Sequence, residues 1–108
     1  MNVKSEGLKW INSTLKPCLS NEFELKFIDE RGGDLGELYG VQFDSETLGG
    51  YVYFWSSGFL GFQLMDYKSE AELVEDTTEV IGSRSYEQVL NALILKLKEC
   101  REKGRIST

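Results

Sequence analysis

Short apolar segments separated by turn residues fill the middle of this chain, and this pattern most limits the fold that the chain can adopt. Large residues alternate with small or polar ones over 22–30, 35–43, 48–55 and 59–67, which is the period of strands with one buried face. The connections are a few residues long and most contain glycine, which tight antiparallel turns require. The pattern therefore predicts a meander of consecutive antiparallel strands.

Both ends of the chain show helical periodicity instead. Apolar residues at helical spacing predict a first helix over 3–15, and Pro17 ends the pattern. Ser85 and Gln88 form a Ser-x-x-Gln capping box, which predicts the start of the last helix. An apolar stripe follows at Tyr86, Val89, Leu90, Leu93, Leu97 and Cys100. Gly104 is the expected C-terminal cap of that helix.

These elements predict one domain of the α+β class over residues 1–108. Its expected order is an N-terminal helix, a four- or five-stranded antiparallel meander sheet, and a C-terminal helix packed on the sheet. A fifth strand over 73–81 is expected at an exposed edge, because it carries several carboxylates. A chain of 108 residues buries roughly two-thirds of its unfolded surface, which is enough for a single core.

The spacing of the cysteines and the lengths of the apolar segments indicate the cellular compartment in which the protein is expected. Cys18 and Cys100 lack CxxC spacing and are expected to be buried, reduced thiols. Residues 1–15 lack the uninterrupted apolar core of a signal peptide, and no apolar run approaches the ~20 residues that span a bilayer. We therefore expect a cytoplasmic protein with no membrane partner.

The sequence contains no recognisable catalytic or cofactor-binding motif. The chain contains no histidine, which removes the commonest general base, the Ser-His and Cys-His pairs and most transition-metal sites. The glycine pairs at 32–33 and 49–50 lie outside any phosphate-loop motif, so we interpret them as turn and bulge glycines. Carboxylate pairs such as Glu75 with Asp76 are interpreted as a solvated acidic face. The sequence thus predicts neither enzymatic activity nor a bound cofactor or metal.

Most of the negative charge is gathered in one region. The chain has a net charge of −6, and between residues 66 and 79 six carboxylates stand against the single cation Lys68. The carboxylates belong to Asp66, Glu70, Glu72, Glu75, Asp76 and Glu79. Such a field repels nucleic acid and anionic membranes and attracts a basic protein. We interpret these six residues as a partner-binding surface.

Aromatic residues are concentrated just before this acidic region. Strand aromatics usually pack beneath a helix, which favours core positions for Phe54, Trp55, Phe59 and Phe62. Tyr51, Tyr53 and Trp55, however, share one face of their strand, and a small domain seldom buries both faces. An exposed row with Tyr53 and Trp55 as partner anchors is therefore the alternative. Binding of RNA to that row is disfavoured, because base stacking normally needs nearby cations to hold the phosphates.

The segment 49–99 combines four features in a fixed order. One strand ends in Trp-Ser-x-Gly, a second apolar strand closes on an acidic residue, an acidic connection follows, and an amphipathic helix completes the segment. The residues are Trp55, Ser56 and Gly58 in the first strand and Phe62, Leu64 and Asp66 in the second. This arrangement resembles the TriTu family of bacterial immunity proteins.

The resemblance implies a function and a partner. It implies that the chain neutralises the C-terminal toxin of a contact-dependent growth inhibition system. The implied toxin is a transfer-RNA nuclease that works with elongation factor Tu, so that factor is an expected further component of the complex. An acidic inhibitor suits a nuclease, whose active site must be electropositive to hold a polyanion.

Two alternatives compete with that function. One is an acidic secretion chaperone or adaptor that holds a partly unfolded partner protein on an open sheet. The other is a small enzyme or ligand-binding domain in which a curved sheet wraps one helix. The latter requires a concave pocket with a perturbed carboxylate.

Overall fold

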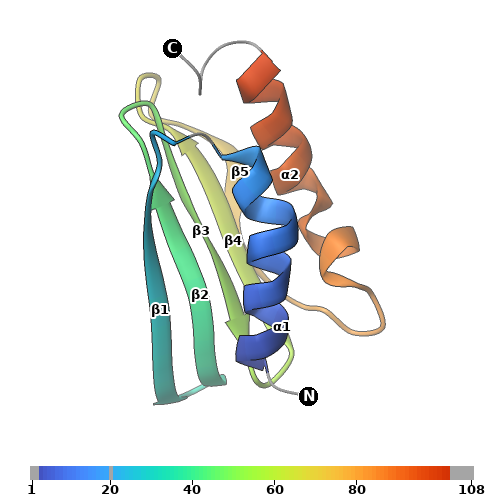
Figure 1. Ribbon diagram of the computed structural model, residues 1–108. Coiled ribbons are helices and arrows are strands. Elements are labelled where there is room, and N and C mark those ends of the chain that lie inside the picture. Colours follow the sequence, from blue (N-terminus) through green and yellow to red (C-terminus); the bar gives the residue numbers. More distant parts are fainter. Residues whose placement is uncertain (1–2, 20, 103–108) are drawn as a thin grey trace.

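The computed structural model describes residues 3–19 and 21–102 and shows one sheet with helices at either end of the chain (Figure 1). The elements are α1 (Val3–Trp10), a π-helical turn (Ile11–Leu15), a 3₁₀ turn (Lys16–Cys18), β1 (Glu24–Gly33), β2 (Gly36–Asp44), β3 (Leu48–Trp55), β4 (Phe59–Asp66), β5 (Ala71–Val80) and α2 (Tyr86–Glu102). The α+β class and the predicted order of elements are confirmed.

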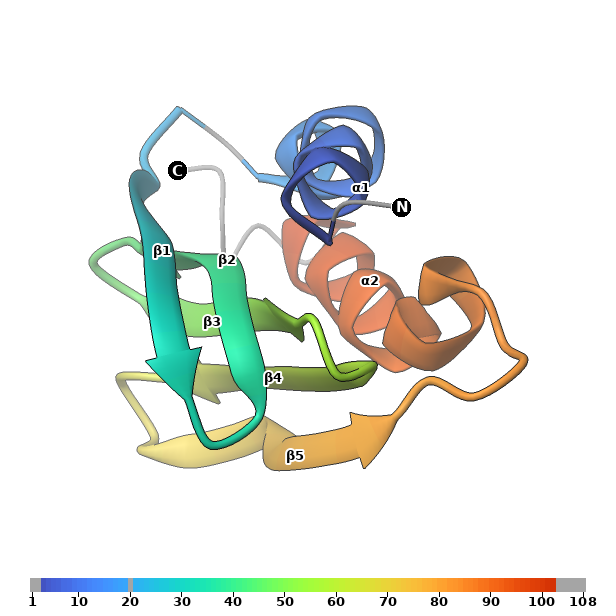
Figure 2. The same ribbon diagram turned by 90° about the horizontal axis from the view of Figure 1, so that it is seen from below.

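The strands form one five-stranded antiparallel sheet in the order β1-β2-β3-β4-β5. Each strand pairs with its neighbour in the chain, as a meander of short turns requires. The predicted fifth strand exists and lies at an edge of the sheet. Both α-helices lie on the same face of the sheet, where α1 packs against β2 and β3 while α2 packs against β4 and β5 (Figure 2).

The core lies between this sheet face and the helices. Its largest fully buried side chains come from both layers, and they include Phe43, Phe54, Leu60 and Leu64 of the sheet and Ile11, Leu15, Leu90, Leu93 and Leu97 of the helical segments. Alternate residues of β2, β3 and β4 point into this layer, which is why the period of two in the sequence marks the buried face.

The first helical segment changes its winding before it ends. The backbone N–H of Lys16 bonds to the carbonyl of Ile11, five residues earlier, and a 3₁₀ turn that contains Pro17 follows. The helix predicted over 3–15 corresponds to α1 and the π-helical turn together, which end at Leu15, and Pro17 lies beyond them in the 3₁₀ turn. Proline fits there because the first residues of a turn have no intrahelical partner for their N–H groups.

The second helix begins as predicted. The backbone N–H of Ser85 donates to Gln88 Oε1 at 2.8 Å, and the backbone N–H of Gln88 donates to Ser85 Oγ at 3.2 Å, which is a complete capping box. The predicted stripe faces the core, where Ile94 joins it. The expected cap at Gly104 lies outside the described residues.

Two further expectations can be compared with the structure. Cys18 and Cys100 are buried and belong to no disulfide, as predicted. Among the described residues, no helix has the length and apolarity that crossing a membrane demands.

Candidate functional site

The sheet has a second face that no described helix covers (Figure 2). The strand registers place Tyr53 opposite Gly40 of β2 and Gly61 of β4, and Tyr51 opposite Gln42 and Gln63. Because directly paired residues point to the same side of a sheet, these side chains share that second face. We call it the open face.

An aromatic row runs along the middle strand of the open face. Tyr51 and Tyr53 stack with ring centroids 4.4 Å apart, and Tyr53 and Trp55 are nearly perpendicular with ring centroids 5.9 Å apart. A Cβ at Gly40 would stand 2.8 Å from Tyr53 Cδ1, and one at Gly61 would stand 2.9 Å from Trp55 Cζ3. The two rings therefore lean onto bare backbone of the neighbouring strands, which only glycine leaves accessible.

The row corrects part of the sequence prediction. Phe54 and Phe62 lie in the core as expected, but Trp55 and Phe59 are half-buried on the open face. The expectation of core positions for Trp55 and Phe59 is wrong, because both helices dock on the opposite side of the sheet. Tyr51, Tyr53 and Trp55 do share the face that the helices leave uncovered, but their side chains are half-buried and not exposed.

The six predicted carboxylates follow the β4–β5 connection and the edge strand. Asp66 ends β4, Glu70 lies in the turn with a φ of 60°, and the other four lie on β5. Their burial ranges from half-buried at Asp66 and Glu79 to exposed at Glu70, Glu72, Glu75 and Asp76. They thus line the β4–β5 edge of the sheet, and β4 lies between the four carboxylates of β5 and the aromatic row of β3.

These carboxylates do not all point the same way. Glu72 pairs with Met65 on the open face, where its Oε2 accepts a hydrogen bond from Gln63 Nε2 at 2.8 Å. This bond and one from the backbone N–H of Asp76 hold the pKa of Glu72 below its ordinary value. The register between β4 and β5 shifts between Phe62 and Met65. Irregularities of this kind bend a strand and increase its twist.

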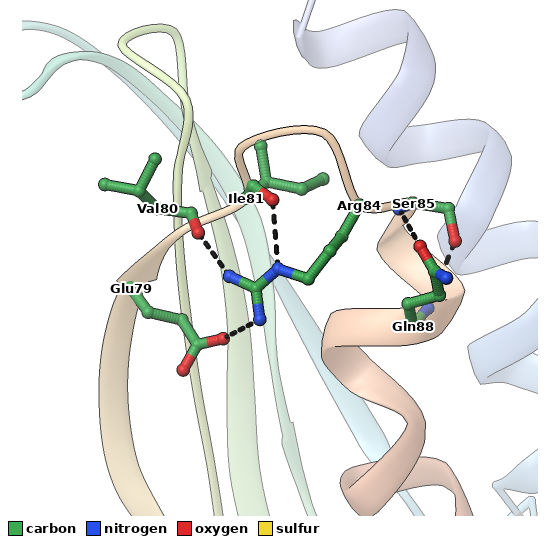
Figure 3. A network of polar contacts seen from close by, with 6 residues as sticks. All are labelled: Glu79, Val80, Ile81, Arg84, Ser85 and Gln88. Carbon is green, nitrogen blue, oxygen red and sulfur yellow. Dashed lines mark hydrogen bonds and ion pairs between the residues drawn. The ribbon is translucent and has the colours of Figure 1, made fainter.

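Glu79 has a different environment. It pairs with Leu60 on the helix-covered face, and its Oε1 lies 3.0 Å from Arg84 Nη1 (Figure 3). The same guanidinium donates to the carbonyls of Val80 and Ile81. Of the six predicted residues, Glu79 is therefore partly neutralised by a neighbour that sequence reasoning did not consider.

Sequence reasoning also missed a contact across the end of the open face. The hydroxyl of Tyr67 donates a hydrogen bond to Asp44 Oδ1, and this bond is the main reason that the pKa of Tyr67 is raised to about 12. The two side chains cross Gly49, which lies inside β3, within the strand expected over 48–55. The glycine pair at 49–50, unusual inside a strand, was the sequence feature that could have indicated a close approach of other side chains to this backbone.

Comparison with known proteins now adds to this geometry. The structure thus defines a small α+β domain with an uncovered aromatic sheet face and an acidic sheet edge. A family model described as immunity protein TriTu matches residues 5–96. This chain therefore belongs to the TriTu family of immunity proteins, and the match extends the resemblance found over 49–99 to α1 and the β1–β2 hairpin. No curated protein and no solved structure gives a significant match.

Proposed function

We propose that this chain neutralises the toxin of a contact-dependent growth inhibition system, and that the toxin is a nuclease that cleaves transfer RNA. Membership of the TriTu immunity family supports a cognate toxin as the partner. We propose two further points that go beyond family membership: the toxin is a nuclease, and this chain acts on it in the cytoplasm. The chain acts by binding and has no catalytic role.

The acidic edge supports this chemistry and is the observation that carries it. Among the described residues, four of the six predicted carboxylates are exposed and lie in no ion pair: Glu70 in the β4–β5 turn and Glu72, Glu75 and Asp76 on β5. The last three lie along a strand that pairs with a neighbour on one side only. A nuclease must present cations to hold RNA, so such an edge can occupy the active site in place of phosphates.

The open face supplies the apolar part of the proposed interface. Interfaces typically combine a few aromatic anchors with a polar rim, and the anchors contribute most of the affinity. Tyr53 and Trp55 are half-buried anchors of this kind, and Glu72 brings the acidic edge onto the same face. We therefore propose that the carboxylates raise the association rate with the toxin, whereas the aromatic row slows dissociation of the complex.

A charge-reversal series tests the acidic edge. Asp66, Glu70, Glu72, Glu75 and Asp76 are changed to lysine in groups of four, and association with the cognate toxin domain is followed by stopped flow. We expect the association rate to fall far more than the dissociation rate rises, and the wild-type rate to fall steeply with added salt. Protection of cells that produce the toxin should fall in parallel.

The chain offers a matched control for that series. Glu24, Glu30, Asp34 and Glu37 are exposed carboxylates of the β1–β2 hairpin, at the other edge of the sheet. Reversal of these four changes the net charge equally but should leave most of the association rate intact. If both sets lowered the association rate equally, the effect would come from the net charge of the protein and not from the acidic edge. Unchanged binding and protection in the first set would exclude it as the interface.

The expected participation of elongation factor Tu is tested separately. The toxin and this chain are mixed with and without purified elongation factor Tu, and the complexes are separated by size. We expect one complex that contains all three proteins. A toxin–immunity complex that excludes the factor would remove it from the proposal.

A further inference from the structure

A cavity of about 220 Å³ opens on the open face, at the end where β2 turns into β3. Its walls are formed by side chains of three strands and the β4–β5 turn, chiefly Gln42, Asp44, Tyr51, Gln63, Met65 and Tyr67. Gly49 forms part of its floor: a Cβ there would stand 1.8 Å from Tyr67 Oη and 2.7 Å from Asp44 Oδ1. The cavity holds several times the ~30 Å³ of one water molecule.

The polar groups of this pocket are mainly acceptors. Tyr67 donates to one oxygen of Asp44, and a carboxylate keeps further acceptor capacity after one such bond. Gln42 Nε2 donates to Tyr53 Oη at 2.6 Å and Gln63 Nε2 donates to Glu72 Oε2 at 2.8 Å. Both amides therefore keep their oxygens as acceptors, and none of the described residues that line the pocket is cationic.

The aromatic wall of the pocket is fixed in place. Tyr51 stacks on Tyr53 at 4.4 Å with an interplanar angle of 26°, so one face of the Tyr51 ring is covered. The electron-rich face of a tyrosine attracts a cation that lies against it. A planar cation with several donors suits an aromatic wall with several acceptors nearby better than a compact ammonium does.

We propose that this pocket receives an arginine side chain of the toxin, with the guanidinium against Tyr51 and hydrogen-bonded to Asp44. This inference rests on the proposed toxin-binding function and names the contact at one end of the interface. Tyr67 acts as a positioning residue, because its hydroxyl fixes the Asp44 carboxylate. The Gln63–Glu72 bond joins the pocket to the acidic edge, so one basic segment of the toxin can reach both.

A larger hollow does not offer the same complementarity. It measures about 360 Å³ and lies between α1 and the start of α2. Its charged lining residues are Glu6, Lys9, Arg84 and Glu87, two of each sign. The Arg84 guanidinium is already bonded to Glu79 and to two backbone carbonyls. The lining of that hollow therefore favours neither a cationic nor an anionic ligand.

The test is the affinity of the cognate toxin domain for three variants. Asp44→Asn keeps the shape of the side chain and removes its charge, and Gly49→Ala fills the floor of the pocket. Each should weaken binding about tenfold or more, mainly through faster dissociation. Glu46→Gln is the matched control, since Glu46 is an exposed carboxylate of the same turn that does not line the pocket. It should stay within about twofold of the wild type.

The outcomes separate this inference from the function on which it rests. If wild-type protein binds and neutralises the toxin while Asp44→Asn binds within twofold of it, the pocket is excluded and the proposed function stands. If the wild type does not bind the toxin, both fall. A double-mutant cycle between Asp44→Asn and alanine variants of the toxin's arginines should reveal one arginine whose effect disappears in the Asp44→Asn background.

A second measurement uses the wild-type protein alone and requires neither the toxin nor any variant. N-acetyl-arginine amide is titrated into the wild-type protein, and the side-chain amide signals of Gln42 and Gln63 are followed by NMR. We expect them to shift, whereas N-acetyl-citrulline amide, which has a similar shape without the charge, should leave them in place. Equal shifts with both compounds, or none with either, would contradict a cation-selective pocket.

Discussion

Gly7 lies inside α1, where glycine normally destabilises a helix by about 0.5–1 kcal/mol relative to alanine. In this fold it is buried, and a Cβ there would stand 2.8 Å from Cδ2 of the fully buried Phe54. Filling so tight a contact costs about 1–3 kcal/mol. Glycine is therefore the residue that allows α1 to approach β3.

Gly7→Ala should accordingly destabilise the protein, although it improves helix propensity. We expect a net loss of about 1 kcal/mol in the free energy of unfolding, measured by denaturant titration. Ser5→Ala is the control, because Ser5 is an exposed residue of the same helix, and it should change stability by less than about 0.5 kcal/mol. A stabilised Gly7→Ala variant would show that α1 does not pack this closely.

The hydrogen bond of Tyr67 should make the stability of the protein depend on pH in the alkaline range. Its bond to Asp44 raises its folded pKa to about 12 from the ordinary value of 10. Because the folded pKa is the higher one, the bond stabilises the fold fully below about pH 10, and this contribution is lost as the pH rises through 12. The difference in unfolding free energy between wild type and Tyr67→Phe should therefore shrink from pH 10 to pH 12. A constant difference over that range would contradict the hydrogen bond.

At the scale of elements, α2 contributes the longest apolar stripe to the core. Leu93 and Leu97 are fully buried, whereas Leu95 on the same helix is 55% exposed. Leu93→Ala and Leu97→Ala should each lower the free energy of unfolding by about 2–5 kcal/mol. Leu95→Ala should lower it by less than about 1 kcal/mol. Similar losses at all three positions in denaturant melts would mean that α2 does not dock through the predicted stripe.

The whole molecule should be catalytically inert. The chain has no histidine and no nucleotide-binding motif, and its family is one of immunity proteins. Purified protein incubated with RNA, nucleotides and simple esters should give no turnover, with the active toxin as the positive control on RNA. Turnover that disappears on a single carboxylate substitution would overturn the inhibitor function.

Much of the fold follows from local patterns. The strand expected over 48–55 has those bounds in the structure, and the other strands differ by up to three residues at their ends. The largest shift is at the first hairpin, where β1 continues through Gly33 and the turn falls at 34–35. Alternation and turn chemistry act over a few residues, so one sequence can specify them well but locates their boundaries less accurately.

The sequence alone determined the order of the elements, the capping box at Ser85, the two faces of β3 and the concentration of carboxylates between 66 and 79. Only the tertiary structure decided that both helices dock on one side, which leaves Trp55 uncovered. It also brought Asp44 to Tyr67, 23 residues away, and Arg84 to Glu79. The physical reason is that periodicity assigns a residue to a face, whereas strand register and helix docking determine which residues meet on that face.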